Sequence, residues 1–246
     1  MEYLLILITG IIGTSIGTLA GGGGFITLPM LLLLGIPIHS AIGASKVSNT
    51  ISSFSSFIYL FRNKKITLKE SIWIIPVSLS GGVCGSFIAS RLHEDVMVGI
   101  AIILLITSFI FSIIQKDTFT GTTKKVPKFL SFSGIYSIGI YNGLFGPGQA
   151  TLMMYLFGFL KVSYIKAIGY VRLASFSSSF GAAITYIFNG HIIWLTTLSL
   201  VLGSVTGAQI GVRIAERLQP KYLKLLLQIV TIALIGQIII QQISSP

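Results

Sequence analysis

Long apolar runs, separated by short polar or basic breaks, follow one another along the whole chain. The runs Tyr3 to Ala20, Val96 to Ile114 and Leu223 to Ile240 approach or reach the roughly 20 apolar residues that cross a bilayer core as a helix. We therefore expect an all-α, polytopic integral membrane protein. Its helical segments are predicted in two series of five: Tyr3–Ala20, Ile26–Gly35, Ser40–Phe61, Lys69–Arg91 and Val96–Ile114, then Lys128–Phe145, Ala150–Leu160, Tyr164–Phe188, His191–Leu218 and Tyr222–Ile240.

Two glycine-rich stretches interrupt the pattern between apolar segments. The first runs from Gly17 to Phe25 and contains four consecutive glycines, and the second, Tyr141 to Gln149, contains Gly-Pro-Gly. Backbone that leaves the helix at membrane depth is tolerated only where protein buries it or where it lines a watery cavity. We therefore predict that these breaks lie near the bilayer midplane and form walls of a substrate site.

The second half of the chain repeats the first. A shift of 126 positions gives 16 identities over the 52 positions from Ala41 to Leu92, and it aligns Lys46 with Arg172. The glycine breaks align at a shift of 124. The sequence thus predicts a first transmembrane repeat at 1–114, a polar, basic connector at 115–127 and a second repeat at 128–246.

The loop charges favour an inverted repeat. If both halves point the same way, the 15 loop cations divide eight against seven between the two sides, whereas an inverted second half places fourteen on one side and only Arg91 on the other. Cytoplasmic loops carry the excess of Lys and Arg. We therefore expect a multi-pass protein of the cell membrane with a cytoplasmic connector and both termini outside.

Composition narrows the class of protein further. Hydrophobic residues make up 53% of the 246, charged residues 9%, and the mean hydropathy is +0.90, which excludes a soluble domain. Although 17 Lys and Arg face six acids, no basic face is interleaved with aromatic residues, so we expect no nucleic-acid partner. No HExxH, paired carboxylates or histidine cluster occurs, so we expect no enzyme, cofactor or metal site.

Lys46 and Arg172 are the two cations that the loop count leaves inside helices. A cation there is costly unless it lines water or has a partner, and all six acids lie near segment ends or in loops. A small anionic substrate would complete both charges. The alternative is snorkelling, in which the long side chain reaches back to the headgroups.

Polar side chains and glycines extend this candidate substrate-binding site. The helical spacing i, i+3, i+7 places Asn49 and Ser53 on the face of Lys46, and it repeats in Ser175 and Ser179 with Arg172. Such serines also serve helix packing or bond to their own backbone. The glycine breaks would add unpaired N–H groups of the short helices beginning at Phe25 or Ile26 and at Gln149 or Ala150. The break residues expected at the site are Gly22, Gly23, Gly24, Gly146, Gly148 and Gln149.

These motifs together resemble the sulfite exporter TauE/SafE family, a group of bacterial and archaeal permeases for sulfur-containing anions. The resemblance rests on Gly21 to Phe25 leading to Pro29, on Ala41 to Lys46, and on Gly143 to Gly148, in the family's order. It implies transport of a small anion, such as sulfite or an organosulfonate. Gln149 stands where a smaller residue is expected, which leaves the identity of the anion open.

The sequence therefore favours an anion transporter that works by alternating access, with export favoured because a negative charge leaves a negative interior readily. An anion channel, a permease for another small organic anion, and a membrane scaffold without transport remain alternatives. The expected partners are the anion and the lipid bilayer, and a homodimer stays open.

Overall fold

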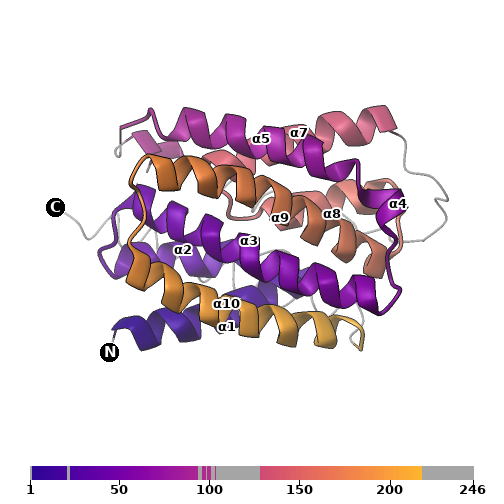
Figure 1. The fold of residues 1–246 in the computed structure, drawn as a ribbon, viewed down its shortest axis with the longest axis horizontal. Helices are drawn as coiled ribbons and strands as arrows, with labels where there is room; N and C mark the ends of the chain where they lie inside the picture. The colour runs from indigo at the N-terminus through magenta and orange to yellow at the C-terminus, as the bar shows by residue number, and fades with distance from the viewer. Residues whose placement is uncertain are drawn as a thin grey trace.

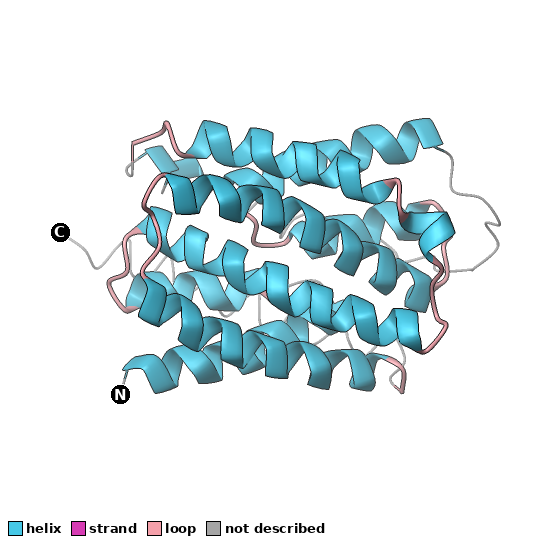
Figure 2. Cartoon of the chain, viewed as in Figure 1, coloured by secondary structure: helices cyan, strands magenta, loops and turns pink. Residues whose placement is uncertain are grey.

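The computed structural model describes residues 2–20, 23–93, 96, 97, 99, 100, 103 and 128–217, and these form helices and short connecting turns (Figures 1 and 2). The predicted connector 115–127, most of the predicted helix 96–114, the predicted helix 222–240 and Gly22 lie outside the described residues. The expectation of an all-α chain agrees with this part of the structure, in which no strand occurs.

Two helical hairpins carry the glycine breaks. The first consists of α1 (Glu2–Ala20) and α2 (Gly24–Leu33), and the second of α7 (Lys128–Leu144) and α8 (Gln149–Phe159). In Figure 1 the first hairpin begins and ends on the left, whereas the second begins and ends on the right. The two turns meet inside the bundle, because a Cβ built on Gly24 would lie 2.8 Å from the Cα of Pro147.

The longest described helices are α3 (Ile38–Arg62) and α9 (Tyr164–Phe188), each of 25 residues. Their bounds differ by 126 at both ends, which is the shift that aligns the two halves of the sequence. They pack against each other in opposite directions: Gly43, near the start of α3, approaches the backbone of His191, just after α9. Both continue without a break because neither contains proline.

One predicted helix is divided in two. The sequence suggested an unbroken segment from Lys69 to Arg91, but the structure has the short α4 (Leu68–Ser71), a bend, and then α5 (Ile74–Ala89). Pro76 explains the new start, because proline is accommodated in the first turn of a helix, where its missing N–H costs nothing. The matching helix of the second half, α10 (Trp194–Ala215), has no such interruption.

Glycine stripes bring neighbouring helices into backbone contact. Gly203, Gly207 and Gly211 of α10 lie against the backbone of Leu7, Ile11 and Ser15 in α1. Gly81 and Gly85 of α5 likewise face α7. Small residues at such spacing let helices approach closely where no hydrophobic driving force exists between them. These glycines therefore serve close helix packing, and the contact of α1 with α10 has its counterpart in the contact of α7 with α5.

Two apolar clusters lie toward opposite ends of the bundle. One gathers around the end of α3, with Phe57, Leu60 and Phe157, and the other around its start, with Ile38, Ile42 and Phe25. The serine-rich middle of α3 lies between them. The fold thus leaves a polar interior at the level of the glycine turns.

Among the described residues, two helices are both long and apolar enough to cross a membrane by composition, Glu2–Leu19 and Trp194–Ala215. Gly24–Leu33 and Ile74–Ala89 are apolar but shorter. Helices α3 and α9 have the length, but their serines and buried cations lower their hydropathy.

Candidate functional site

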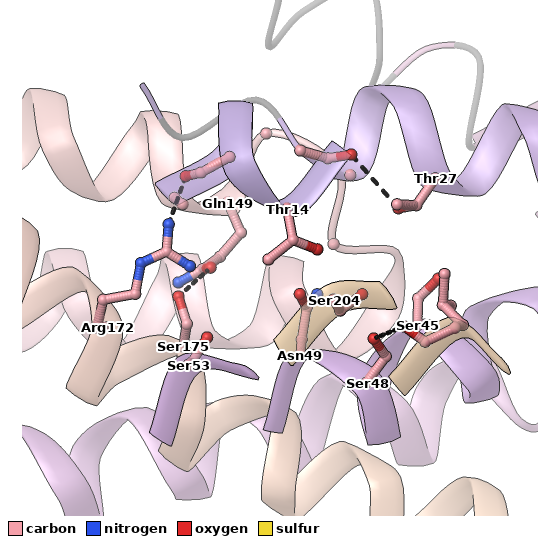
Figure 3. A pocket seen from close by; sticks show the side chains of 17 residues that line it. Thr14, Thr27, Ser45, Ser48, Asn49, Ser53, Gln149, Arg172, Ser175 and Ser204 are labelled. Atoms are coloured by element: carbon pink, nitrogen blue, oxygen red, sulfur yellow. Dashed lines mark hydrogen bonds between the residues drawn. The ribbon is translucent and has the colours of Figure 1, made fainter. Parts of the chain in front are cut away.

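A small cavity opens where the two glycine turns face α3, α9 and α10 (Figure 3). Its volume is about 40 Å³, which is enough for a few waters or one small anion, since roughly 10–15 Å³ holds one water. Residues from both halves line it: Thr14, Gly17, Gly23, Gly24, Thr27, Ser45, Ser48, Asn49, Ser53, Gly146, Gly148, Gln149, Ala150, Arg172, Ser175, Leu200 and Ser204.

The structure brings together nine of the twelve predicted site residues. These are Asn49, Ser53, Gly23, Gly24, Gly146, Gly148, Gln149, Arg172 and Ser175, all of which line the cavity. Lys46 and Ser179 do not line it, and Gly22 lies outside the described residues. The stripe on α9 therefore divides, with Arg172 and Ser175 at the cavity and Ser179 away from it.

Arg172 supplies the positive charge of the cavity. Its side chain is 5% exposed, and Nη2 donates a hydrogen bond of 2.5 Å to the backbone oxygen of Gly17. Nε is buried without a hydrogen-bond partner in the described chain. Since a guanidinium carries five N–H donors in a fixed fork, it keeps donors beyond the bond to Gly17 for an anion in the cavity.

Neutral donors surround the guanidinium. Ser175 Oγ donates to Gln149 Oε1 at 2.8 Å, which fixes the amide of Gln149 and leaves its Nε2 without a partner among the described residues. The buried Oγ atoms of Ser45 and Ser53 are also unpaired there. Buried polar groups are normally hydrogen-bonded, so several convergent exceptions indicate a site for a hydrogen-bonding ligand.

The glycine turns shape the cavity, although their N–H groups differ from expectation. Gly146 and Gly148 have φ of +107° and +82°, which favour glycine, and they let the chain reverse directly before α8. The N–H groups of Ile26 and Gln149, predicted to be unpaired, donate to Gly23 O at 3.1 Å and Gly146 O at 3.0 Å. These two N–H groups form hydrogen bonds within the turns, so they do not donate to a ligand in the cavity.

Lys46 is buried in a different environment. It is 1% exposed, and Nζ donates to Asn142 Oδ1 at 3.2 Å and to the backbone oxygen of Phe145 at 3.0 Å. Asn142 Nδ2 in turn donates to Ser178 Oγ at 2.7 Å and Ser179 Oγ at 3.1 Å. The sequence indicates no carboxylate partner for Lys46, and in the described structure a carbonyl and an amide oxygen take the place of one.

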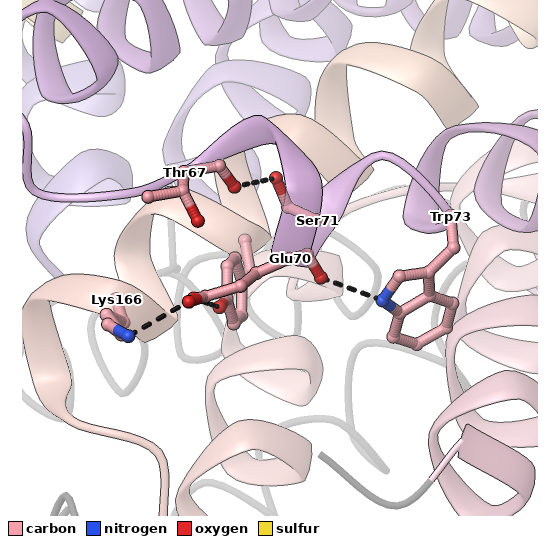
Figure 4. A network of polar contacts seen from close by, with 6 residues as sticks. Thr67, Glu70, Ser71, Trp73 and Lys166 are labelled. Atoms are coloured by element: carbon pink, nitrogen blue, oxygen red, sulfur yellow. Dashed lines mark hydrogen bonds and ion pairs between the residues drawn. The ribbon is translucent and has the colours of Figure 1, made fainter. Parts of the chain in front are cut away.

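The described ion pairs lie away from the cavity. Lys166 Nζ lies 3.2 Å from Glu70 Oε2, which also accepts a hydrogen bond from Tyr170 (Figure 4). Lys65 Nζ lies 3.6 Å from Glu216 Oε1. The hydrogen bond from Lys166 holds the pKa of Glu70 below its ordinary value. Both pairs join the two halves of the chain, and neither neutralises Arg172.

Sequence reasoning missed part of the lining. Thr14, Ser48, Leu200 and Ser204 were not identified as site residues, whereas Gly17 belongs to the first glycine break, which was predicted to form a wall of the site. A signal for Ser204 existed, because the shift of 126 aligns it with Ser78. Thr14 and Ser48 show no comparable pattern, since their place at the cavity depends on how the hairpin meets α3.

A comparison with protein-family models decides the family. The model described as sulfite exporter TauE/SafE matches residues 5–238, which is nearly the whole chain. This chain belongs to the TauE/SafE family. It is consequently a membrane transporter protein, and the resemblance found in the glycine motifs is confirmed.

Curated relatives of this TauE/SafE chain carry similar descriptions. It is 31% identical over 234 residues to "probable membrane transporter protein ORF9" of Sinorhizobium sp, covering 93% of this chain and 89% of that protein. It is 26% identical to "probable membrane transporter protein YfcA" of Escherichia coli K12, covering 88% and 81%. A third relative, from Methanocaldococcus jannaschii, is 28% identical with 92% of both chains covered. No solved structure matches the chain significantly.

Proposed function

We propose that this TauE/SafE protein carries a small oxyanion, of the sulfite or organosulfonate class, across the cell membrane through the cavity at Arg172. The observation that carries the proposal is the buried guanidinium of Arg172, which lines a polar cavity that no described carboxylate lines. An anion with several oxygens can accept from the guanidinium, from Gln149 Nε2 and from Ser53 Oγ together. Hydrogen bonds to a charged acceptor in a low-dielectric site are the strong ones.

The composition of the cavity supports an oxyanion over an apolar solute. Serines, two threonines and the amides of Asn49 and Gln149 line the cavity together with the guanidinium, and Leu200 is the one large aliphatic side chain among the lining residues. The small volume supports a compact anion of few heavy atoms. The family name points to sulfite, and the identity of the anion is part of the proposal.

Transport would proceed by alternating access between two inverted repeats. Matching helix bounds support the repeat, and the opposite directions of the two hairpins in Figure 1 support the inversion. Inverted-repeat transporters place their site at the interface of the repeats, as the cavity is placed between α3 and α9. With the repeats at 1–114 and 128–246, the basic connector would be cytoplasmic and both termini outside, as the loop charges predict.

Export is the direction that the membrane potential favours. One negative charge that leaves a negative interior gains about 2.3 kcal/mol per 100 mV. No described carboxylate lies at the cavity to relay a proton, so the potential alone would drive the anion.

The proposal is tested with the purified full-length protein in proteoliposomes. Fluxes of sulfite, thiosulfate, sulfate and a small sulfonate are measured with and without an imposed potential. At least one of these anions should move, and a potential that is negative on the loaded side should speed its exit. Transport of a cation while none of these anions moves would overturn the proposal, and single-channel currents would overturn alternating access.

A further inference from the structure

The two buried cations make reciprocal contacts between the halves. Lys46 of α3 donates to the backbone oxygen of Phe145, directly after α7, and Arg172 of α9 donates to that of Gly17, in the last turn of α1. Each cation therefore binds the C-terminal end of the other half's broken helix, where unpaired carbonyls and the helix dipole favour positive charge.

Although the contacts correspond, their surroundings differ. Ser53 lies on the same face of α3 as Lys46, seven positions further along, but it lines the cavity of Arg172. Its Oγ has no hydrogen-bond partner among the described residues. Ser179, which is 126 positions further along, accepts a hydrogen bond from Asn142 and lies outside the cavity. The cluster of Lys46, Asn142 and Ser179 thus contains the same kinds of group as the cavity, but with its donors engaged inside the protein.

The second glycine turn lies between Lys46 and the cavity. Gly146 lines the cavity, and a Cβ built on Gly146 would collide with Lys46 Nζ. The ammonium therefore lies directly behind the turn. A displacement of this turn by the width of a side chain would bring Nζ, Asn142 and Ser179 to the cavity.

We infer that Lys46 and Arg172 face the transported anion alternately, Arg172 in the state described here and Lys46 after the halves exchange conformations. The inference rests on the proposed anion transport. Two similar halves can adopt each other's arrangement at small energetic cost, so both states can be populated. Exposing one cation at a time also avoids placing two positive charges in one small cavity of low dielectric, where their repulsion would be strong.

In this cycle Lys46, Asn142 and Ser179 form the second binding arrangement, for the same oxyanion that Arg172, Gln149 and Ser53 hold in the first. The ammonium supplies a compact charge, whereas the guanidinium supplies paired donors. When Lys46 faces away from the anion, the carbonyl of Phe145 accepts its N–H, and Arg172 keeps its bond to Gly17 while it holds the anion. Neither charge is then left buried without a partner, which would be costly.

Cysteine accessibility tests the exchange directly. The only native cysteine is removed by Cys84→Ser, and Ser53→Cys and Ser179→Cys are made separately in the full-length protein. A charged, membrane-impermeant methanethiosulfonate is added to one face of oriented proteoliposomes at a time. Ser78→Cys serves as the control, because Ser78 is fully buried, donates to Ala174 O and lies outside the cavity.

The inference predicts that Ser53→Cys and Ser179→Cys react from opposite faces, and that a reversed membrane potential slows one while it speeds the other. Ser78→Cys should stay unmodified from both faces. Inertness of Ser179→Cys from both faces overturns the inference, as does reaction of both site cysteines from one face only or equal reaction of Ser78→Cys. Anion flux through the Cys84→Ser protein is measured in parallel, and its absence counts against the proposed function separately.

A second measurement separates Lys46 from a merely structural role. The probe is sulfite, or the fastest anion of the flux panel. In Lys46→Met, the equilibrium affinity for this anion from the open side should stay within about twofold of the unchanged protein, because Arg172 still binds the anion. Net flux should fall by about tenfold or more. Lys46→Arg should restore flux in part. If binding and flux fall together in both variants, or if neither falls, Lys46 does not face the anion and the inference is wrong.

Discussion

Arg172 and Gly17, from different halves of the chain, are joined by a hydrogen bond of 2.5 Å from the guanidinium to the backbone carbonyl. The bond fixes the guanidinium plane against the last turn of α1 and directs its remaining donors toward the cavity. It also makes the site a product of both halves, since α9 provides the charge and α1 provides the support. Changes at this interface should therefore alter binding and stability together.

Gln149 should set the size of the anion that is accepted. Gln149→Ala removes the amide that Ser175 holds and enlarges the small cavity. We expect the rate for a small sulfonate relative to sulfite to rise by about tenfold, the usual effect of a side-chain-sized change in a pocket. Competition between the two anions in a flux assay measures this ratio. Gln209→Ala, outside the cavity, is the control, and an equal change there would contradict the assignment.

Gly146 should tolerate alanine poorly. Its φ of +107° and the contact of a Cβ with Lys46 Nζ both oppose a side chain, whereas Gly35, at +75°, has open space around it. A residue held in such a sparsely populated region costs about 1–3 kcal/mol. Gly146→Ala should thus lower the unfolding temperature in detergent more than Gly35→Ala does. Equal shifts for the two variants would show that Lys46 does not press on this turn.

Gly207 should be needed for the contact between α10 and α1. A Cβ there would collide with the backbone of Ile11, so alanine must push the helices apart. Overpacking typically costs about 1–3 kcal/mol. Gly99→Ala, on helical backbone with no described atom within 4 Å of the added Cβ, should be neutral or stabilising by up to about 1 kcal/mol. Thermal unfolding of both variants measures the difference, and a neutral Gly207→Ala would contradict the packing described.

The Glu70 network should respond to acid. Because Lys166 holds the native pKa of Glu70 below its ordinary value of 4.5, the network's contribution to stability is fully present above that pH. It is lost as pH falls through the lower native pKa. Trp73 Nε1 donates to Glu70 O, so Trp73 fluorescence in a Trp194→Phe background reports the change. The midpoint should lie below 4.5, and Glu70→Gln should abolish the transition; a transition that persists in Glu70→Gln would assign it to another group.

The sequence alone predicted the helices well wherever a helix was uninterrupted. The predicted bounds of the helix at Tyr164–Phe188 match α9, and those of Ser40–Phe61 lie within two residues of α3. Hydrophobic pattern and length decide such segments. The break before α5 was missed. Pro76 fits the first turn of a helix, but it does not by itself show that a bend precedes it.

The site was predicted in part, for a physical reason. Arg172, Gln149 and the glycine turns follow from charge and backbone chemistry, which a sequence displays. Whether a buried cation faces a cavity or a helix end depends on tertiary contacts, so Lys46 was expected at the cavity although Phe145 and Asn142 hold it outside. The sequence repeat suggested equal roles for Lys46 and Arg172, but in this conformation only Arg172 of the two lines the cavity.

The most direct test of the account is anion flux through Arg172→Gln in proteoliposomes, beside the unchanged protein and Arg213→Gln. Arg213 is an exposed cation of α10 outside the cavity, so it controls for loss of charge. We predict that Arg172→Gln lowers sulfite or sulfonate flux at least about tenfold, because a charge-assisted hydrogen bond to the anion is lost, while Arg213→Gln changes it little. Undiminished anion flux through folded Arg172→Gln would contradict the account.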